Sequence, residues 1–238
     1  MTNLPPESDE INPPVVDLEE KLRAVQQRIA LAAERSSRTS DSVELIAVSK
    51  YRPMEQLLVQ YQLGQRHFAE NRVQESQRKI PEFPSGCTWH LIGPLQTNKA
   101  KYLPGLIDFI HSVEREKVVN ALESAYAQAG ITVKVLVQVN IAEEEQKSGC
   151  EPDEVEHLIQ FCQASPSLRV EGLMTMAPYC DDPEKARPIF RALRELAEAV
   201  RKNTGLALPH LSMGMSGDFE VAVEEGSTLV RIGSALYE

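Results

Sequence analysis

The stretch VKVLVQVN at residues 133–140 decides the fold, because it is an almost unbroken run of valine and leucine. Such residues favour strands. A strand that is apolar on both faces is typical of a parallel sheet covered by helices on each side. The segments on either side of this stretch repeat the same organisation, so the rest of the chain can be placed around it.

Short apolar segments alternate with helix-forming segments along most of the chain. We expect strands at residues 43–48, 66–69, 88–92, 108–113, 133–140, 168–176, 208–212 and 228–233. We expect helices from Pro53 onward and over residues 71–79, 97–102, 115–129, 153–163, 183–202 and 218–224. Alternating strands and helices imply a parallel sheet. Eight such units predict an α/β fold, a single TIM-like (β/α)8 barrel, in preference to an open sheet.

The N-terminal segment differs from the rest of the chain. Residues 1–14 contain four prolines among acidic and asparagine residues, which is typical of a flexible tail. Leu18, Leu22, Val25 and Ile29 then recur at helical spacing, which predicts an extra helix up to about Ser36. The expected organisation is a tail over 1–14 and a barrel over 15–238.

Charge and composition exclude several classes of function. Lys and Arg total 25 and Asp and Glu total 35, so the formal net charge is −10. An acidic surface repels nucleic-acid backbones and anionic lipids. No apolar run approaches the roughly 20 residues of a membrane helix, and the start MTNLPPESDE does not resemble a signal peptide. The four cysteines lack paired C-x-x-C spacing, so we expect no metal, reduced thiols and a cytoplasmic location.

The barrel prediction indicates where chemistry would occur. The dinucleotide motif G-x-G-x-x-G and the nucleoside-triphosphate motif G-x-x-x-x-G-K-[ST] are both absent from the sequence. In TIM barrels the active site lies at the carboxyl ends of the strands. The polar residues in or just after the predicted strands are Lys50, Glu70, Asn71, His90, Asn140, Ser212 and Arg231.

Lys50 directly follows the first predicted strand. A lysine that is partly desolvated and near another cation has a lowered pKa, and its neutral amine can then attack an aldehyde. From position alone a solvated surface lysine is the commoner case. Its role therefore depends on the residues around it.

Two C-terminal segments are suited to a phosphate group. SMGMSGDF at residues 212–219 is rich in Gly and Ser and precedes a predicted helix, and RIGSALYE at residues 231–238 follows the last strand. Backbone N–H groups at a helix start attract anions, and barrels often bind phosphate after strands seven and eight. An ordinary capped turn would show the same composition.

The histidines are harder to interpret. His90 could stack on or hydrogen-bond to a ligand ring, but a lone histidine on an apolar strand is more often a core residue whose hydrogen bonds are satisfied. His67, His111, His157 and His210 show no ligand spacing with one another, so no role is assigned to them.

Taken together, these segments resemble the pyridoxal phosphate homeostasis proteins, a family related to the N-terminal barrel of alanine racemase, fold type III. The resemblance rests on LIAVSKYRP (45–53), HFAENRVQE (67–75), WHLIGPLQTNK (89–99), VLVQVNIAEEEQKSG (135–149), GLMTMAP (172–178), LSMGMSGDFEVAVEEGST (211–228) and VRIGSALYE (230–238). Two residues depart from the usual pattern. Ala69 stands where Gly is usual and Arg72 where an aromatic residue is common, and both could alter the loop after strand two.

The resemblance implies a cofactor and a set of residues that bind it. The cofactor is pyridoxal phosphate (PLP), held as a Schiff base on Lys50, with Arg231 facing its ring nitrogen. The phosphate would be held by Ser212, Ser216, Gly217, Gly233 and Ser234. Asn71 and His90 would line the other side of the cofactor, and Lys147 would assist cofactor exchange from a loop.

Arg231 limits the chemistry that such a site could perform. A guanidinium keeps its proton and can only donate to the ring nitrogen, which therefore stays unprotonated. An unprotonated pyridine ring is a poor electron sink, so the site suits racemisation or simple holding of the cofactor.

Three functions remain open at this point. The first is a cofactor carrier or regulator in the cytoplasm, with apoenzymes that use PLP as candidate recipients and amino acids as further ligands. The second is an amino-acid racemase, which needs an acid or base on each face of the substrate carbon. The sequence ends at Glu238 without the second domain of alanine racemases, so we expect a carrier and a monomer. The third, a Schiff-base aldolase, leaves the two phosphate segments without a ligand.

Overall fold

Eight parallel strands close into a barrel, each paired with its neighbour in chain order. The computed structural model describes residues 15–142 and 148–238. The strands are β1 (Glu44–Val48), β2 (His67–Glu70), β3 (Thr88–Leu91), β4 (Phe109–Val113), β5 (Val133–Gln138), β6 (Leu168–Met174), β7 (His210–Ser212) and β8 (Leu229–Ile232). β1 and β8 close the barrel, with Ile46 opposite Arg231. The predicted TIM-like barrel is confirmed.

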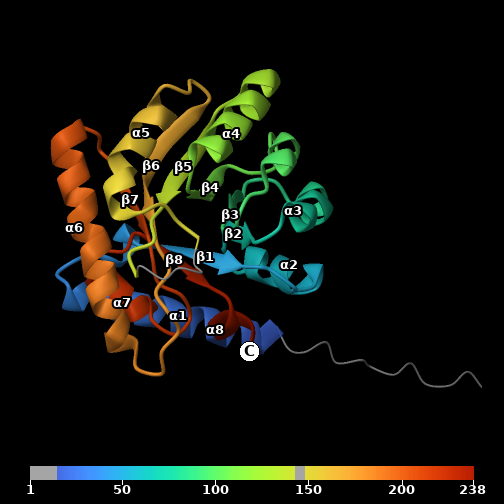
Figure 1. The fold of residues 1–238 in the computed structure, drawn as a ribbon. Helices are drawn as coiled ribbons and strands as arrows, with labels where there is room; N and C mark the ends of the chain where they lie inside the picture. The colour runs from blue at the N-terminus through green and yellow to red at the C-terminus, as the bar shows by residue number, and fades with distance from the viewer. Residues whose placement is uncertain (1–14, 143–147) are drawn as a thin grey trace, which may run out of the picture.

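Helices surround the barrel, as Figure 1 shows. They are α1 (Val15–Arg35), α2 (Met54–Gln62), α3 (Val73–Lys79), α4 (Glu116–Ala129), α5 (Val155–Gln163), α6 (Arg187–Thr204), α7 (Phe219–Glu224) and α8 (Ser234–Tyr237). Short 3₁₀ turns cover Ser40–Ser42, Ile80–Glu82, Thr97–Tyr102, Pro152–Glu154 and Pro183–Ala186. The extra leading helix α1 lies across one side of the barrel, against α2, α7 and α8.

Two apolar layers hold these elements together. The larger layer fills the space between strands and helices, where the helical repeat of α1 buries Leu18, Leu22, Val25 and Ile29. The smaller layer fills the barrel interior and contains Ile46, Val48, Ala69, Phe109, Leu136, Met174 and Leu229. Successive side chains of a strand point to opposite faces, so each strand supplies both layers.

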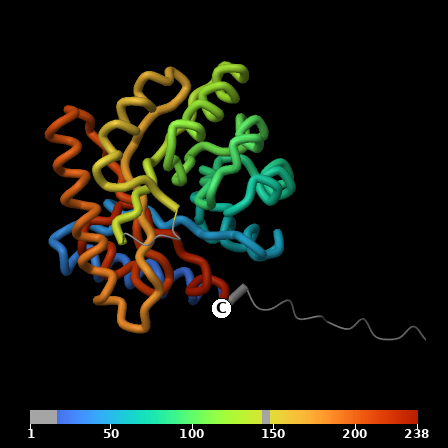
Figure 2. The backbone as a smooth tube through the Cα atoms, in the orientation of Figure 1, coloured from blue at the N-terminus to red at the C-terminus, as the bar shows by residue number. Residues whose placement is uncertain are grey.

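Small differences separate the predicted elements from the observed ones. The second strand begins at His67 and ends at Glu70, so Glu70 belongs to the strand and does not follow it. The four-residue helix α8, which was not predicted, lies beside α1 near the end of β1, as the tube view shows (Figure 2). Among the described residues, no helix has the length and hydropathy needed to cross a membrane.

Candidate functional site

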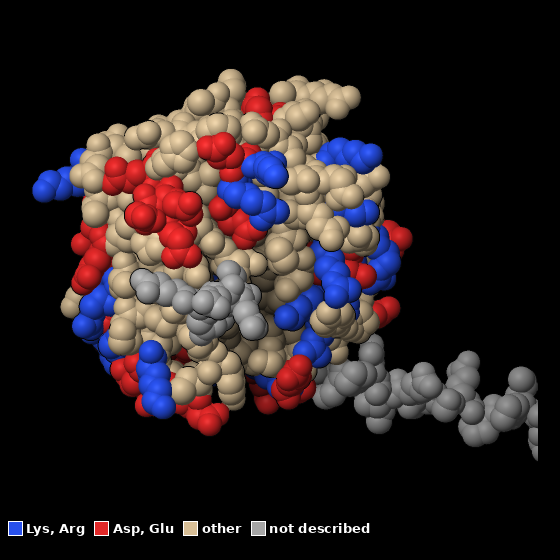
Figure 3. Space-filling view, viewed as in Figure 1, with Lys and Arg blue, Asp and Glu red and all other residues tan. Residues whose placement is uncertain are grey.

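A cavity of about 680 Å³ opens at the carboxyl ends of the strands. This volume lies in the usual range for small-molecule sites. Its lining includes most of the predicted site residues: Lys50, Asn71, Ser216, Gly217, Arg231, Gly233 and Ser234. The strand ends bring these residues together from separate parts of the sequence, as expected of a TIM barrel. In the space-filling view the molecule is hollowed near the centre of the visible face (Figure 3).

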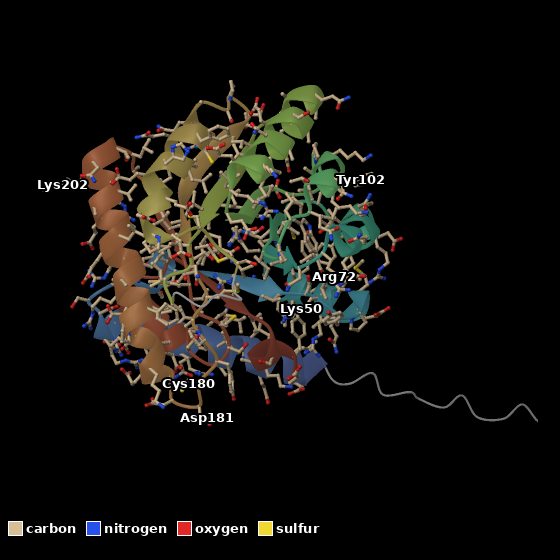
Figure 4. All side chains as sticks on the ribbon, viewed as in Figure 1. Lys50, Arg72, Tyr102, Cys180, Asp181 and Lys202 are labelled. Carbon is tan, nitrogen blue, oxygen red and sulfur yellow. The ribbon has the colours of Figure 1, made fainter. Side chains whose placement is uncertain are left out.

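Lys50 lies at the mouth of this cavity, directly beyond the end of β1 (Figure 4). Its side chain is exposed, which agrees with the commoner case for a lysine at a strand end and not with a desolvated amine. The next residue, Tyr51, has a left-handed backbone with φ of 62°. A non-glycine residue in this region is strained, and such strain tends to occur at functional sites.

A buried ion pair supports the backbone just before Lys50. Lys79 Nζ lies 2.7 Å from Glu70 Oε1 and donates to the Ser49 carbonyl oxygen at 2.7 Å. The Ser49 hydroxyl donates to the same carboxylate oxygen, also at 2.7 Å. The Lys79 and Glu70 side chains are 1% and 0% exposed, so neither charge is solvated by bulk water. The pair therefore fixes the end of β1 from inside the protein.

Arg231 lies at the base of the cavity and is 3% exposed. Its Nη1 donates to Ser212 Oγ at 2.6 Å, and its Nη2 donates to the Thr175 carbonyl oxygen at 3.0 Å. Burial lowers the pKa of Arg231 to about 10, and Asp218 opposes this effect. The guanidinium therefore remains cationic at neutral pH and is held in one orientation by two acceptors.

Open hydrogen-bond donors gather at the loops after β7 and β8. Within residues 15–142 and 148–238, the backbone N–H groups of Ser216, Gly217 and Ser234 have no acceptor. Ser216 Oγ accepts from the N–H groups of Gly233 and Ala235, both at 3.2 Å, which ties the two loops together. An anion would satisfy these donors.

One acid lies beside these donors. Asp218 lines the cavity, and its Oδ1 accepts from the Met215 N–H at 2.6 Å. Burial raises the pKa of Asp218, although the Met215 N–H and Arg231 pull it in the other direction. The Asp218 side chain shapes the loop beside the open N–H donors.

The loop after β2 contributes Asn71 to the opposite side of the cavity. Asn71 Oδ1 is buried and lacks a hydrogen-bond partner in the described part of the chain. It is therefore an acceptor available to a ligand. Of the two residues that depart from the family pattern, Ala69 lies in the barrel interior, and Arg72 is exposed at the start of α3 (Figure 4).

Gly93 allows the Asn71 loop to approach closely. A Cβ atom at Gly93 would lie 2.1 Å from the Asn71 carbonyl oxygen, which is backbone and cannot rotate away. We expect Gly93→Ala to destabilise the fold by about 1–3 kcal/mol and to displace Asn71. Urea unfolding and a crystal structure of the variant test this. An unchanged unfolding midpoint together with an unmoved Asn71 would contradict it.

His90 and Ser212 are placed differently from expectation. Neither lines the cavity, and they are 1% and 0% exposed. The alternation of strand side chains explains this for His90, because Ile92, two residues further on, takes the cavity position. Ser212 lies under Arg231 and accepts from its guanidinium. Both side chains therefore lie in the layer beneath the cavity lining, and their contact with a ligand stays a prediction.

Several residues were not identified from the sequence. His111 connects His90 to Ser212, and Ile92, Met176 and Tyr179 line the cavity. The alternation of inward-facing positions in β4 could have revealed His111, since Phe109 two residues earlier also faces the barrel interior. Lys147 lies outside the described residues, as do residues 1–14. Among the residues described, no group of His, Cys, Asp or Glu is placed to hold a metal.

Sequence comparison shows which proteins share these features. Residues 21–238 match the family described as alanine racemase, N-terminal domain. The pyridoxal phosphate homeostasis protein of Aquifex aeolicus is 43% identical over 219 residues, covering 92% of this chain and 96% of that protein. The protein of the same name from Escherichia coli K12 is 37% identical over 231 residues, covering 93% and 96%.

Solved structures agree with the sequence comparison. PipY of Synechococcus elongatus, determined with PLP bound, matches with a TM-score of 0.80 at 32% identity, covering 93% of this chain and 100% of that chain. Alanine racemase from Corynebacterium glutamicum matches with a TM-score of 0.68 at 17% identity, covering 91% of this chain and 61% of that chain. The second likeness is one of fold alone.

Proposed function

The chain belongs to the pyridoxal phosphate homeostasis protein family, and from this premise we propose that it binds PLP and helps to balance the cellular pool of the cofactor. One observation carries the proposal: a single cavity combines an exposed amine, a buried cation and open N–H donors. These three features match the aldehyde, the aromatic ring with its nitrogen, and the phosphate of PLP.

Each residue of the cavity then has a distinct role. PLP supplies an aldehyde that condenses with a lysine amine with loss of one water molecule, and Lys50 presents that amine at the cavity mouth. Arg231 would donate toward the ring nitrogen, and Asn71 would accept a hydrogen bond from the ligand.

The phosphate of PLP would occupy the end of the cavity formed by the loops after β7 and β8. Ser216, Gly217, Gly233 and Ser234 line that end. The open N–H groups of Ser216, Gly217 and Ser234 are donors of the kind that phosphate oxygens accept.

Titration with PLP tests this function. We expect visible absorbance to appear and to saturate at one equivalent of PLP per chain. Pyridoxine phosphate, which has the phosphate but no aldehyde, is the matched ligand: it should compete for the site without producing the absorbance. A protein that stays colourless after incubation with excess PLP and removal of the unbound PLP by gel filtration would contradict the proposal.

Ser234 offers a test of the phosphate position. Its side chain is exposed and makes no hydrogen bond within the described residues, so removing the hydroxyl costs the fold nothing. A hydrogen bond to a charged group contributes about 1.5–3 kcal/mol. We therefore expect Ser234→Ala to weaken PLP binding about tenfold or more. Pyridoxal, which lacks the phosphate, should bind both proteins equally; an equal loss for both ligands would place the phosphate elsewhere.

Racemisation of amino acids is the second candidate function. The cavity contains Tyr179 and Cys180 in addition to Lys50, so proton-transferring groups are present on more than one segment. Incubating the PLP-loaded protein with L-alanine and other amino acids, and following enantiomer ratios, separates the two functions. Turnover at about 1 per second or faster would favour a racemase.

The setting of the protein follows from the proposed function. We propose that it acts in the cytoplasm, where its cysteines stay reduced, since Cys87, Cys150, Cys162 and Cys180 are all free thiols. We also propose that it acts as a monomer and passes PLP to apoenzymes. The exposed mouth of the cavity, with Tyr179 90% exposed, supports ready exchange of the ligand.

A further inference from the structure

Polar side chains form a chain of hydrogen bonds through the apolar interior of the barrel. From the base of the cavity, Arg231 Nη1 reaches Ser212 Oγ at 2.6 Å, and Ser212 Oγ lies 2.9 Å from His111 Nδ1. His111 Nε2 then lies 2.9 Å from His90 Nδ1, and His90 Nε2 lies 3.1 Å from His67 Nδ1. Each link has the length of a good hydrogen bond.

This row of hydrogen-bonded side chains ends at the opposite mouth of the barrel. His67 Nε2 lies 3.7 Å from Glu44 Oε2, and these side chains are 27% and 49% exposed. His67 and Glu44 begin β2 and β1, whereas the PLP cavity lies beyond the other ends of these strands. Polar groups therefore connect water at one mouth with the cavity at the other.

At the cavity, Arg231 and Ser212 fix the direction in which the hydrogen bonds of this row are donated. Arg231 can only donate, so one lone pair of Ser212 Oγ is taken by its guanidinium. The Ser212 hydroxyl then has its own hydrogen to donate, and His111 Nδ1 is the acceptor in reach. A hydrogen on His111 Nδ1 would leave the Ser212 hydrogen without an acceptor in the described residues. The hydrogen of His111 is thus expected on Nε2, directed at His90.

The Glu44 end of the row favours the same direction of the hydrogen bonds. At 3.7 Å the Glu44 carboxylate is too far from His67 Nε2 for a hydrogen bond, but its negative charge favours a hydrogen on that nitrogen. His67 Nδ1 is then free to accept from His90. Burial lowers the pKa of His90 and His111 well below 6.5, so each carries a single N–H at neutral pH. Both ends thus select one arrangement, with hydrogen on Nε2 of all three rings.

We infer that these side chains form a relay that orients Arg231 for the ring of PLP and transmits changes at the far mouth to the cavity. The relay consists of Arg231, Ser212, His111, His90, His67 and Glu44. His111, His90 and His67 are positioning residues in it, since they act on the ligand through Arg231. This inference rests on the proposed function for its effect on PLP, but the direction of the hydrogen bonds is independent of any ligand.

Nitrogen-15 NMR of the histidine side chains, in protein with no PLP added, tests the direction. We expect His67, His90 and His111 all to carry hydrogen on Nε2 at neutral pH. Exposed His157 on α5 serves as the internal reference. A hydrogen on Nδ1 of His90 or His111 would overturn the relay.

Variants test transmission to the cavity. His67→Leu removes the acceptor of the His90 Nε2–H, whereas Ser212 still holds the hydrogen of His111 on Nε2. The nitrogen-15 shifts of His90 should therefore change, those of His111 should change little, and PLP affinity should fall about twofold to thirtyfold. His157→Leu is the matched control and should change neither. If His67→Leu fails to fold, Glu44→Gln removes the charge at the same end on an exposed side chain and should change the nitrogen-15 shift of His67 Nε2.

His111 is the positioning residue nearest to Arg231, and it can be replaced conservatively by asparagine. Asn in place of His111 keeps an acceptor near the position of Nδ1, whereas Phe keeps the ring shape without it. We expect His111→Phe to shift the absorption maximum of bound PLP and His111→Asn to restore it. Unchanged nitrogen-15 shifts of His90 or His67 together with unchanged PLP affinity in the His67 or Glu44 variant would overturn the relay. Failure of the wild type to bind PLP would instead refute the proposed function and leave the tautomer result standing.

Discussion

Replacing Lys50 by arginine should abolish covalent capture of PLP and leave the fold intact. Arginine keeps the positive charge, but a guanidinium is effectively never deprotonated and cannot supply the neutral amine that an aldehyde needs. Within the described residues the Lys50 amine makes no hydrogen bond or ion pair, and the side chain is exposed. The free energy of unfolding should therefore stay within about 0.5 kcal/mol of the wild type.

Absorbance titration and urea unfolding together measure both parts of this prediction. The matched control is Lys202→Arg, since Lys202 is exposed near the end of α6, far from the cavity (Figure 4). The control should develop the same absorbance as the wild type. Visible absorbance in the Lys50→Arg protein, together with an adduct that borohydride makes permanent, would show that another lysine captures the aldehyde.

The second large effect is expected at Lys79, beneath the cavity. Lys79→Met leaves the Glu70 carboxylate buried without its cation and the Ser49 carbonyl without its donor. Breaking one side of a buried ion pair costs about 3–5 kcal/mol. We expect a loss of this size in urea unfolding, together with weaker PLP binding, because Ser49 precedes Lys50.

Two control variants show whether the broken ion pair causes the loss of stability in Lys79→Met. Lys21→Met breaks an exposed pair with Asp17 one helical turn away, and should cost at most about 1 kcal/mol. The double variant Lys79→Met with Glu70→Leu removes both buried charges and should recover most of the stability. A Lys79→Met protein as stable as the wild type would mean that the pair does not hold the end of β1.

The barrel could be predicted because its signals are local. The unbroken apolar run of β5 and the regular alternation of strands and helices follow from backbone preference and burial alone. The end of β2 was misplaced by one residue and α8 was missed, since four residues carry too little periodicity to indicate a helix. These differences are at element boundaries, where local signals are weakest.

The position of the site could also be predicted, because strand ends of a barrel converge. Lys50, Asn71 and Arg231 were expected to meet there and do line one cavity. Local sequence could not predict how far below the cavity surface each inward-facing side chain lies. His90 lies one layer below the cavity, since the strand alternation places Ile92 there instead.

The hydrogen-bond partners of buried polar residues could not be predicted from the sequence, for a different reason. Lys79 pairs with Glu70, nine residues earlier, and His111 contacts Ser212, 101 residues later. Each residue alone is compatible with a solvated surface or a core position. Only the closed barrel, which places distant strands across from one another, shows that these groups satisfy each other's hydrogen bonds.

The most direct test of the account is to locate the PLP adduct on the chain. The protein would be mixed with one equivalent of PLP, reduced with borohydride, digested and examined by peptide mass spectrometry. We predict a single modified peptide that carries the reduced pyridoxyl phosphate group on Lys50. Modification spread over several exposed lysines, or found mainly on a lysine outside the cavity, would contradict the central claim.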